Sequence, residues 1–151
     1  MQSNRCLVFR WVYAACLIAM ATTFAGCAKG DPERALRESV TALQVAVDAR
    51  DAGAIEDLLA GDFVGPEGLD RQGARRMAQL VFLRHQNVSA TLGPLGVSMQ
   101  DDHATVRFTA VLTGGAGGLL PETGQLYEVE TGWRLLEGDW KLTSAKWTPQ
   151  L

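Results

Sequence analysis

Asp62, His103 and Glu128 are the candidates for acid–base chemistry in this 151-residue sequence. A proton-transfer enzyme needs a carboxylate whose pKa is raised in a cavity, and a donor for the negative charge that develops on its substrate. If a cavity holds one of these residues, the protein is a small isomerase, cyclase or hydrolase. His103, however, follows two aspartates at an expected turn, where a histidine is usually solvated. We therefore favour a protein without catalytic residues and keep the enzyme as the alternative.

The other polar residues match no known pattern for a metal, phosphate or nucleic-acid site. His85 and His103 are far apart and have no cysteine at ligand spacing, and His85 is placed to cap the end of a helix. The glycine-rich residues 114–118 join two expected strands and precede no helix, which predicts a flexible hairpin tip. No run of lysine or arginine supplies the basic surface of a nucleic-acid binder. We expect no metal, no cofactor and no nucleic acid.

The first residues have the composition of an export signal. Arg5 and Arg10 give a positive start, residues 11–21 are apolar, and residues 24–27 read Phe-Ala-Gly-Cys. The apolar run is shorter than the roughly 20 residues that cross a bilayer. Loss of this segment would leave 12 of the 14 lysines and arginines against 17 acidic residues, a net charge of about −5.

Residues 24–27 resemble the lipobox of bacterial lipoproteins, although Phe24 replaces the usual leucine. The resemblance implies cleavage between Gly26 and Cys27, then acylation, for example with palmitate, of Cys27 and of the new N-terminus. Two or more acyl chains would anchor the protein stably to a membrane. The implied parts are a signal peptide at residues 1–26, a lipidated tether at 27–30 and one domain at 31–151.

Two points remain open in this interpretation. An ordinary signal with a chance cysteine, or an uncleaved anchor, would also fit the segment. Ala28 stands where an aspartate would imply retention in the inner membrane, so the resemblance favours the outer membrane, facing the periplasm, in a Gram-negative cell. Because Cys6 and Cys16 would leave with the signal, the mature fold has no internal disulfide and depends on its core.

The periodicity of apolar residues predicts three helices at the start of the domain. An aspartate and a proline at residues 31–32 favour a helix start, and an apolar stripe continues to about residue 50. A short helix is expected at residues 53–60, followed by a loop at 61–68 that is rich in turn formers. Asp70 is placed to cap a third helix that runs to about Arg84.

After residue 87 the pattern changes to the alternation typical of strands. Apolar residues alternate near residues 88–92, 106–112 and 125–136, and a last strand runs toward Trp147 after a turn at 137–138. Helices followed by antiparallel strands predict an α+β domain with the helices on one sheet face.

Three segments resemble the nuclear transport factor 2-like (NTF2-like, SnoaL-like) superfamily, which includes ketosteroid isomerase and the polyketide cyclases. They are residues 49–63, 102–106 and 133–142. The resemblance implies a cone in which three N-terminal helices pack on a curved antiparallel sheet and leave a cavity. The isomerase takes a tyrosine from its helical layer, whereas Tyr127, the only tyrosine of the mature chain, lies on an expected strand, which argues against that reaction.

Six aromatic residues could line such a cavity for a lipid or another small hydrophobic molecule, or could form a solid core. They are Phe63, Phe82, Phe108, Tyr127, Trp133 and Trp140. The direction of Trp147 depends on whether the last strand contains a bulge.

Charged residues of the expected sheet indicate which of its faces points away from the helices. Glu128, Glu130 and Arg134 share a strand face, and Arg107 and Thr109 are expected opposite the two glutamates. This patch is either a solvated surface or a polar surface that binds a partner or forms the contact of a homodimer. Together these features favour a membrane-anchored, non-enzymatic binding or interaction module.

Overall fold

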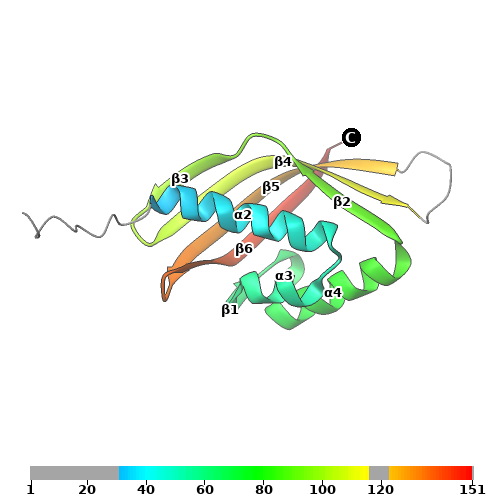
Figure 1. Cartoon of the computed structure of the whole chain (residues 1–151), viewed down its shortest axis with the longest axis horizontal. Helices are drawn as coiled ribbons and strands as arrows, with labels where there is room; N and C mark the ends of the chain where they lie inside the picture. The colour runs from blue at the N-terminus through cyan, green and yellow to red at the C-terminus, as the bar shows by residue number, and fades with distance from the viewer. Residues whose placement is uncertain (1–30, 116–122, 151) are drawn as a thin grey trace, which may run out of the picture. The chain divides into compact units, whose positions relative to one another are not determined.

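The computed structural model describes residues 31–115 and 123–150. The expected signal peptide, the cleavage and acylation sites at Gly26 and Cys27, and residues 116–118 of the expected hairpin tip lie outside the described residues. The unit from Asp31 onward has its own hydrophobic core. Its described part contains three α-helices and a sheet of six strands, which confirms the α+β class. The first strand comes between the second and third helices in the sequence, which corrects the expectation that all helices precede the strands. Figure 1 shows how these elements are arranged.

Each α-helix starts after an aspartate whose carboxylate accepts hydrogen bonds from the free backbone N–H groups of the first turn. Asp31 accepts from Glu33 N at 3.0 Å, and Asp70 accepts from Gly73 N at 2.6 Å, so both predicted caps are confirmed. His85 is the C-cap residue of the last helix, as expected. The helices are α2 (Pro32–Asp48), α3 (Ala52–Leu58) and α4 (Arg71–Arg84).

The sheet is mixed, which corrects the expectation of an antiparallel one. Its strands are β1 (Leu59–Val64), β2 (Asn87–Leu92), β3 (Gly96–Gln100), β4 (His103–Gly115), β5 (Thr123–Leu136) and β6 (Asp139–Gln150). Their order is β1-β6-β5-β4-β2, and β3 also pairs with β4. All pairs are antiparallel except β1 with β6, which are parallel.

Strand β1 occupies residues expected to end a helix and begin a loop. Gly61 and Asp62 are poor strand formers, so the local sequence favours a turn. Pairing with β6, more than 70 residues later in the chain, overrides this preference. The burial of Phe63 also favours the strand. Only a short 3-10 turn, η2 (Pro66–Gly68), remains of the predicted loop.

A bulge in β6 changes which side chains face the helices. Gly132 pairs with Ser144 and Trp133 pairs with Leu142, so Thr143 is an extra residue in the ladder. Leu142 points toward the helices before the bulge, and Ala145 and Trp147 do so after it. This answers the question that the sequence left open about Trp147.

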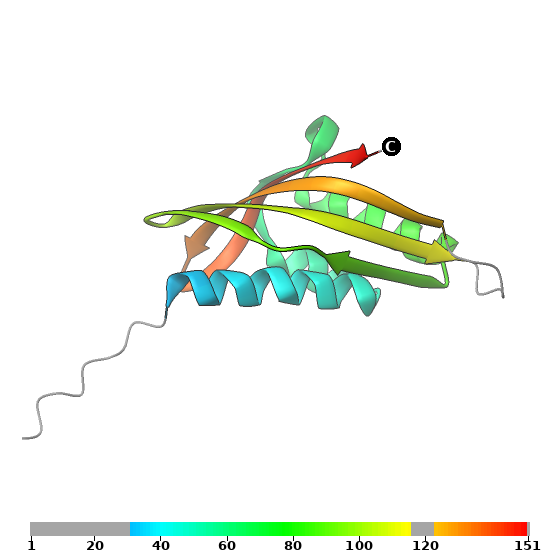
Figure 2. The same ribbon diagram turned by 90° about the horizontal axis from the view of Figure 1, so that it is seen from above.

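The helices lie on the concave side of the curved sheet (Figures 1 and 2). At one end α2 packs directly on the strands, where Leu36, Val40, Val106 and Trp133 are at most 2% exposed. The buried hydroxyl of Thr131 accepts a hydrogen bond from Trp133 Nε1 at 2.9 Å and donates one to the Val106 carbonyl at 3.1 Å. We call this region the closed end.

Candidate functional site: an apolar cavity

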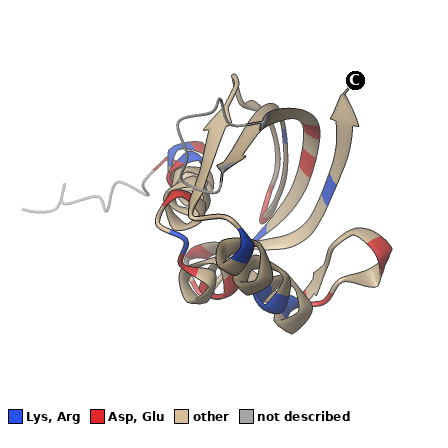
Figure 3. Ribbon diagram, turned by 90° about the vertical axis from the view of Figure 1, so that its right-hand side faces the viewer, with Lys and Arg blue, Asp and Glu red and all other residues tan. Residues whose placement is uncertain are grey.

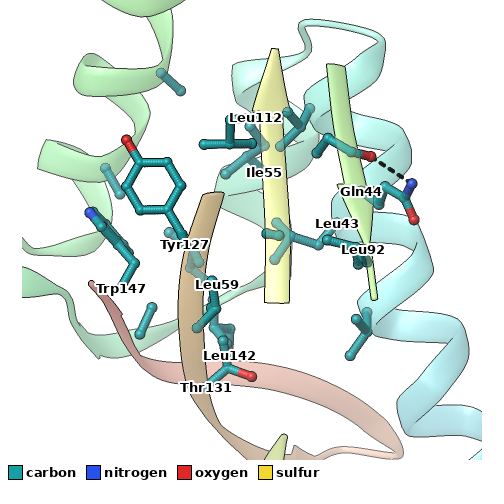
Figure 4. Close-up of a pocket in the computed structure, with 18 of the residues that line it drawn as sticks. Leu43, Gln44, Ile55, Leu59, Leu92, Leu112, Tyr127, Thr131, Leu142 and Trp147 are labelled. Atoms are coloured by element: carbon teal, nitrogen blue, oxygen red, sulfur yellow. Dashed lines mark hydrogen bonds between the residues drawn. The ribbon is translucent and has the colours of Figure 1, made fainter. Parts of the chain in front are cut away.

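A cavity of about 500 Å³ lies between the helices and the concave sheet face, beyond the closed end. Figure 4 shows Leu43 and Gln44 of α2 on one side of it and Tyr127 and Trp147 of the sheet on the other. Almost all of its wall is apolar. The lining includes Val40, Leu43, Val47, Ile55, Leu59, Phe63, Ala74, Met77, Val81, Phe82, Ala90, Leu92, Phe108, Ala110, Leu112, Tyr127, Val129, Trp133, Leu142, Ala145 and Trp147.

The cavity opens to solvent between α4 and the ends of β4 and β6. Four lining residues there are between 38% and 40% exposed although they are large and apolar: Met77, Val81, Leu112 and Trp147. A cluster of large apolar side chains exposed to water is unfavourable, and such clusters usually mark a surface that binds a ligand or a partner. We call these four residues the mouth of the cavity.

Five of the six aromatic residues proposed from the sequence contribute to the lining. Phe63, Phe82, Phe108, Tyr127 and Trp133 come from β1, α4, β4 and β5. Trp140 does not line the cavity, so the predicted lining is wrong at this residue. Its indole Nε1 donates to the carbonyl of Pro32 at 3.1 Å, so the ring is buried at the closed end beneath the start of α2.

The aliphatic part of the wall was not predicted from the sequence. Leu43 and Val47 continue the predicted stripe of α2, and Ala90 and Leu92 alternate on β2. These periodic patterns indicate buried side chains, but they do not distinguish the wall of a cavity from a core. Trp147 carried no usable signal, because its direction depends on the bulge.

Polar groups in the wall mostly bind the protein itself. Gln44 Nε2 donates to the carbonyl of Ala90 at 2.7 Å. Asp48, which is not a lining residue, accepts from Ala90 N at 2.8 Å, and the two bonds hold α2 against the edge strand β2. The hydroxyl of Thr131 is occupied by its two hydrogen bonds at the closed end. Tyr127 is the only tyrosine among the described lining residues and contributes the only phenolic hydroxyl there.

The three candidate catalytic residues lie outside the cavity. Asp62 forms an ion pair with Arg134 at 2.9 Å, and this hydrogen-bonded guanidinium lowers the pKa of the Asp62 carboxyl, the opposite of what a general acid requires. His103 Nδ1 lies 2.7 Å from an Asp102 carboxylate oxygen in an exposed turn, and this contact lowers the pKa of Asp102.

Glu128 is exposed and pairs across the sheet with Thr109 and Thr148, away from the cavity. The predicted outer-face patch has the expected register, since Arg107 lies opposite Glu130 and bonds it at 2.7 Å. Among the described residues, no carboxylate, histidine, lysine or arginine lines the cavity.

A metal-binding cluster and a membrane-spanning helix are both absent from residues 31–115 and 123–150. Their histidines and carboxylates form no cluster of three or more that could hold a metal ion. None of their helices combines the length and apolar composition needed to cross a membrane.

Solved structures share this arrangement of helices and curved sheet. A protein of the NTF2-like family from Streptomyces avermitilis, described as a candidate dehydratase, aligns with a TM-score of 0.69 at 23% identity over 78% of this chain and 95% of its own. Another neighbour, a protein from Nostoc punctiforme with a cystatin-like fold, aligns with a TM-score of 0.65 at 14% identity over 78% of this chain and 90% of its own. The domain has the NTF2-like fold.

Two further solved structures resemble this domain. One from Cytophaga hutchinsonii covers 80% of this chain and 99% of its own at 15% identity, with a TM-score of 0.64. A candidate scytalone dehydratase from Novosphingobium aromaticivorans has a TM-score of 0.72 at 12% identity, over 79% of this chain and 84% of its own. No family model and no curated protein matches the sequence. The comparisons therefore identify the NTF2-like fold, and the chemistry must be argued from the site.

Proposed function

We propose that this protein is a membrane-anchored bacterial lipoprotein whose NTF2-like domain binds one small apolar molecule, or one acyl chain, without transforming it. The observation that carries the proposal is the cavity, whose described wall is apolar and holds no charged side chain. A volume of about 500 Å³ falls within the range of about 300–1,000 Å³ typical of ligand sites. Burial of apolar ligand surface there supplies the binding free energy.

The same wall is the argument against catalysis. Proton transfer needs a titratable group within hydrogen-bonding distance of the ligand. Asp62, His103 and Glu128 are exposed residues outside the lining, and the phenol of Tyr127 has no acidic or basic partner among the described lining residues. Two fold neighbours are named as candidate dehydratases, but a fold hosts many functions and does not transfer a reaction.

The membrane anchor is supported by the N-terminal sequence. A positive start, an apolar centre and the tetrapeptide ending at Cys27 support acylation of this cysteine. An apolar ligand has low solubility in water, so a binding domain gains from being held beside the bilayer in which such molecules dissolve.

Native mass spectrometry of the full chain, purified gently from membranes, tests both parts. We expect a chain that begins at an acylated Cys27 and carries one additional apolar molecule. In Ala110→Phe, a phenyl group enters the cavity from β4, and we expect the additional mass to disappear. Val111→Phe is the matched control, because Val111 lies next to it on the outer face and is 37% exposed.

Loss of the bound mass in both variants, or in neither, would contradict binding in the cavity. A mature chain that starts at another residue and carries no fatty acid would contradict the anchor. The two results are read from separate mass differences in one spectrum, so one part of the proposal can fail without the other.

A further inference from the structure

Helix α4 exposes apolar side chains beside the mouth of the cavity. Leu80 is 55% exposed and Leu83 is 82% exposed. They are three residues apart, and Arg76 and Arg84 lie four residues before and after Leu80, so helical geometry places all four on one face. This face continues to the mouth, because Arg76, Met77 and Trp147 border the same surface depression.

The charges of α4 differ in sign from the net charge of the chain. The helix contains four arginines and no acidic residue, whereas the whole chain has a net charge of −3. Arg71 and Arg75 face α3, where Arg75 pairs with Glu56 at 2.7 Å. Arg76 and Arg84 are exposed and form no ion pair with another residue of the described ranges. Figure 3 shows the blue positions along α4.

We propose that the mouth of the cavity docks on a bilayer surface containing anionic phospholipids, so that an apolar ligand passes between the bilayer and the cavity without crossing water. The docking face consists of Arg76, Leu80, Leu83, Arg84 and Trp147. Leucines and an indole enter the boundary between headgroups and acyl chains, and the arginines bind phosphate groups. The inference rests on the proposed function, because it gives the ligand of the cavity a source.

A second copy of the chain is a weaker occupant for this face. Two such faces brought together about a twofold axis would bring two positively charged surfaces close to each other, with repulsion between like charges. An anionic bilayer neutralises the same arginines and also accepts the leucines. Both the charge and the apolar character of the docking face are then satisfied by one partner.

Quenching of Trp147 in vesicles tests the docking. The full chain is reconstituted through its own anchor into vesicles of phosphatidylcholine, alone or mixed with phosphatidylglycerol, that carry bromine on the acyl chains near the headgroups. We expect quenching that requires phosphatidylglycerol and decreases with salt, and that is lost in Trp147→Phe. Each of Arg76→Gln and Arg84→Gln should lower the ratio of docked to undocked protein about fivefold, the effect typical of one basic residue at such a surface.

Matched variants separate docking from general effects of charge and hydrophobicity. Lys146→Gln removes an equal charge from the outer sheet face and should leave the quenching unchanged. Val45→Ser removes an apolar side chain that is 58% exposed on α2, and it should have no effect, whereas Leu80→Ser should weaken docking. Glu67 borders the depression beside Arg76, so Glu67→Gln should strengthen docking.

Three results would overturn the inference. They are quenching that does not depend on phosphatidylglycerol or on the two arginines, absence of quenching in all vesicles, and crosslinking of Leu80→Cys to a second copy in place of docking. The mass spectrum of the same preparation reports the anchor and the bound ligand separately. A bound ligand without docking therefore contradicts this inference alone, whereas an empty cavity contradicts the proposed function.

Discussion

The two ends of the concave sheet face are built from the same kinds of side chain, yet one is solid and the other holds a cavity. Each long element contributes to both ends. On α2, Leu36 is buried at the closed end, Val40 is buried there and also borders the cavity, and Leu43 lies farther along and lines the cavity. On β4, Val106 is fully buried and Leu112 at the mouth is 39% exposed.

The difference comes from the elements that cover the sheet. At the closed end α2 packs directly on the strands, and the indole of Trp140 bonds the first residue of that helix. At the other end α4 contacts α3 and β1, while the ends of β4, β5 and β6 face it across the cavity. An apolar sheet face therefore becomes a core or a binding site depending on how closely a helix covers it.

The sharpest way to test this comparison is to shorten one leucine at each end. Leu36→Ala should lower the free energy of unfolding by about 2–5 kcal/mol, because it leaves a void in a closely packed region. Leu112→Ala should change it by less than about 1 kcal/mol, since the side chain already borders solvent. Urea denaturation of both variants measures the difference, and equal losses would contradict the distinction between the ends.

A smaller effect is expected from the buried hydrogen bonds of the closed end. Thr131→Val keeps the shape of the side chain but leaves the Trp133 indole N–H without its acceptor, which should cost about 1–3 kcal/mol. Thr109→Val, at an exposed position of β4, is the matched control and should have little effect. If both variants unfold at the wild-type urea concentration, the buried hydrogen bonds do not stabilise the closed end.

The smallest effect is expected on the outer face, at the ion pair of Asp62 and Arg134. Because Arg134 lowers the pKa of Asp62 below its ordinary value of 3.8, the pair stabilises the fold above that value, and this contribution is lost as the pH falls through the folded-state pKa. The stability difference between wild type and Asp62→Asn should therefore shrink on acidification. Arg134→Gln should reproduce the change, and a difference that grows toward low pH would contradict the assignment.

The sequence was sufficient for the parts of the fold that depend on local signals. Aspartate caps and apolar stripes located the helices, and alternation located β4 and β5 with the register that places Arg107 opposite Glu130. Strand β1 was missed because its formation depends on pairing with β6, which no local pattern reveals.

The site was less predictable for a similar reason. Aromatic content indicated six lining residues, and five of them line the cavity. The distance between α4 and the sheet decides between a core and a cavity, and it is a property of tertiary packing. Trp140 and Trp147 show the limit most clearly. Both look alike in the sequence of β6, and the extra residue Thr143 together with the contact to Pro32 assigns them to different surroundings.

Photo-crosslinking of a diazirine-bearing fatty acid to the full chain in its membrane tests the central claim most directly. Peptide mass spectrometry should place the label on wall residues such as Met77, Val129 and Trp147, and unlabelled fatty acid should compete for it. Labelling should be lost in Ala110→Phe. Label that stays on outer-face residues such as Val111 and is unaffected by competitor would show that the cavity does not bind an apolar ligand.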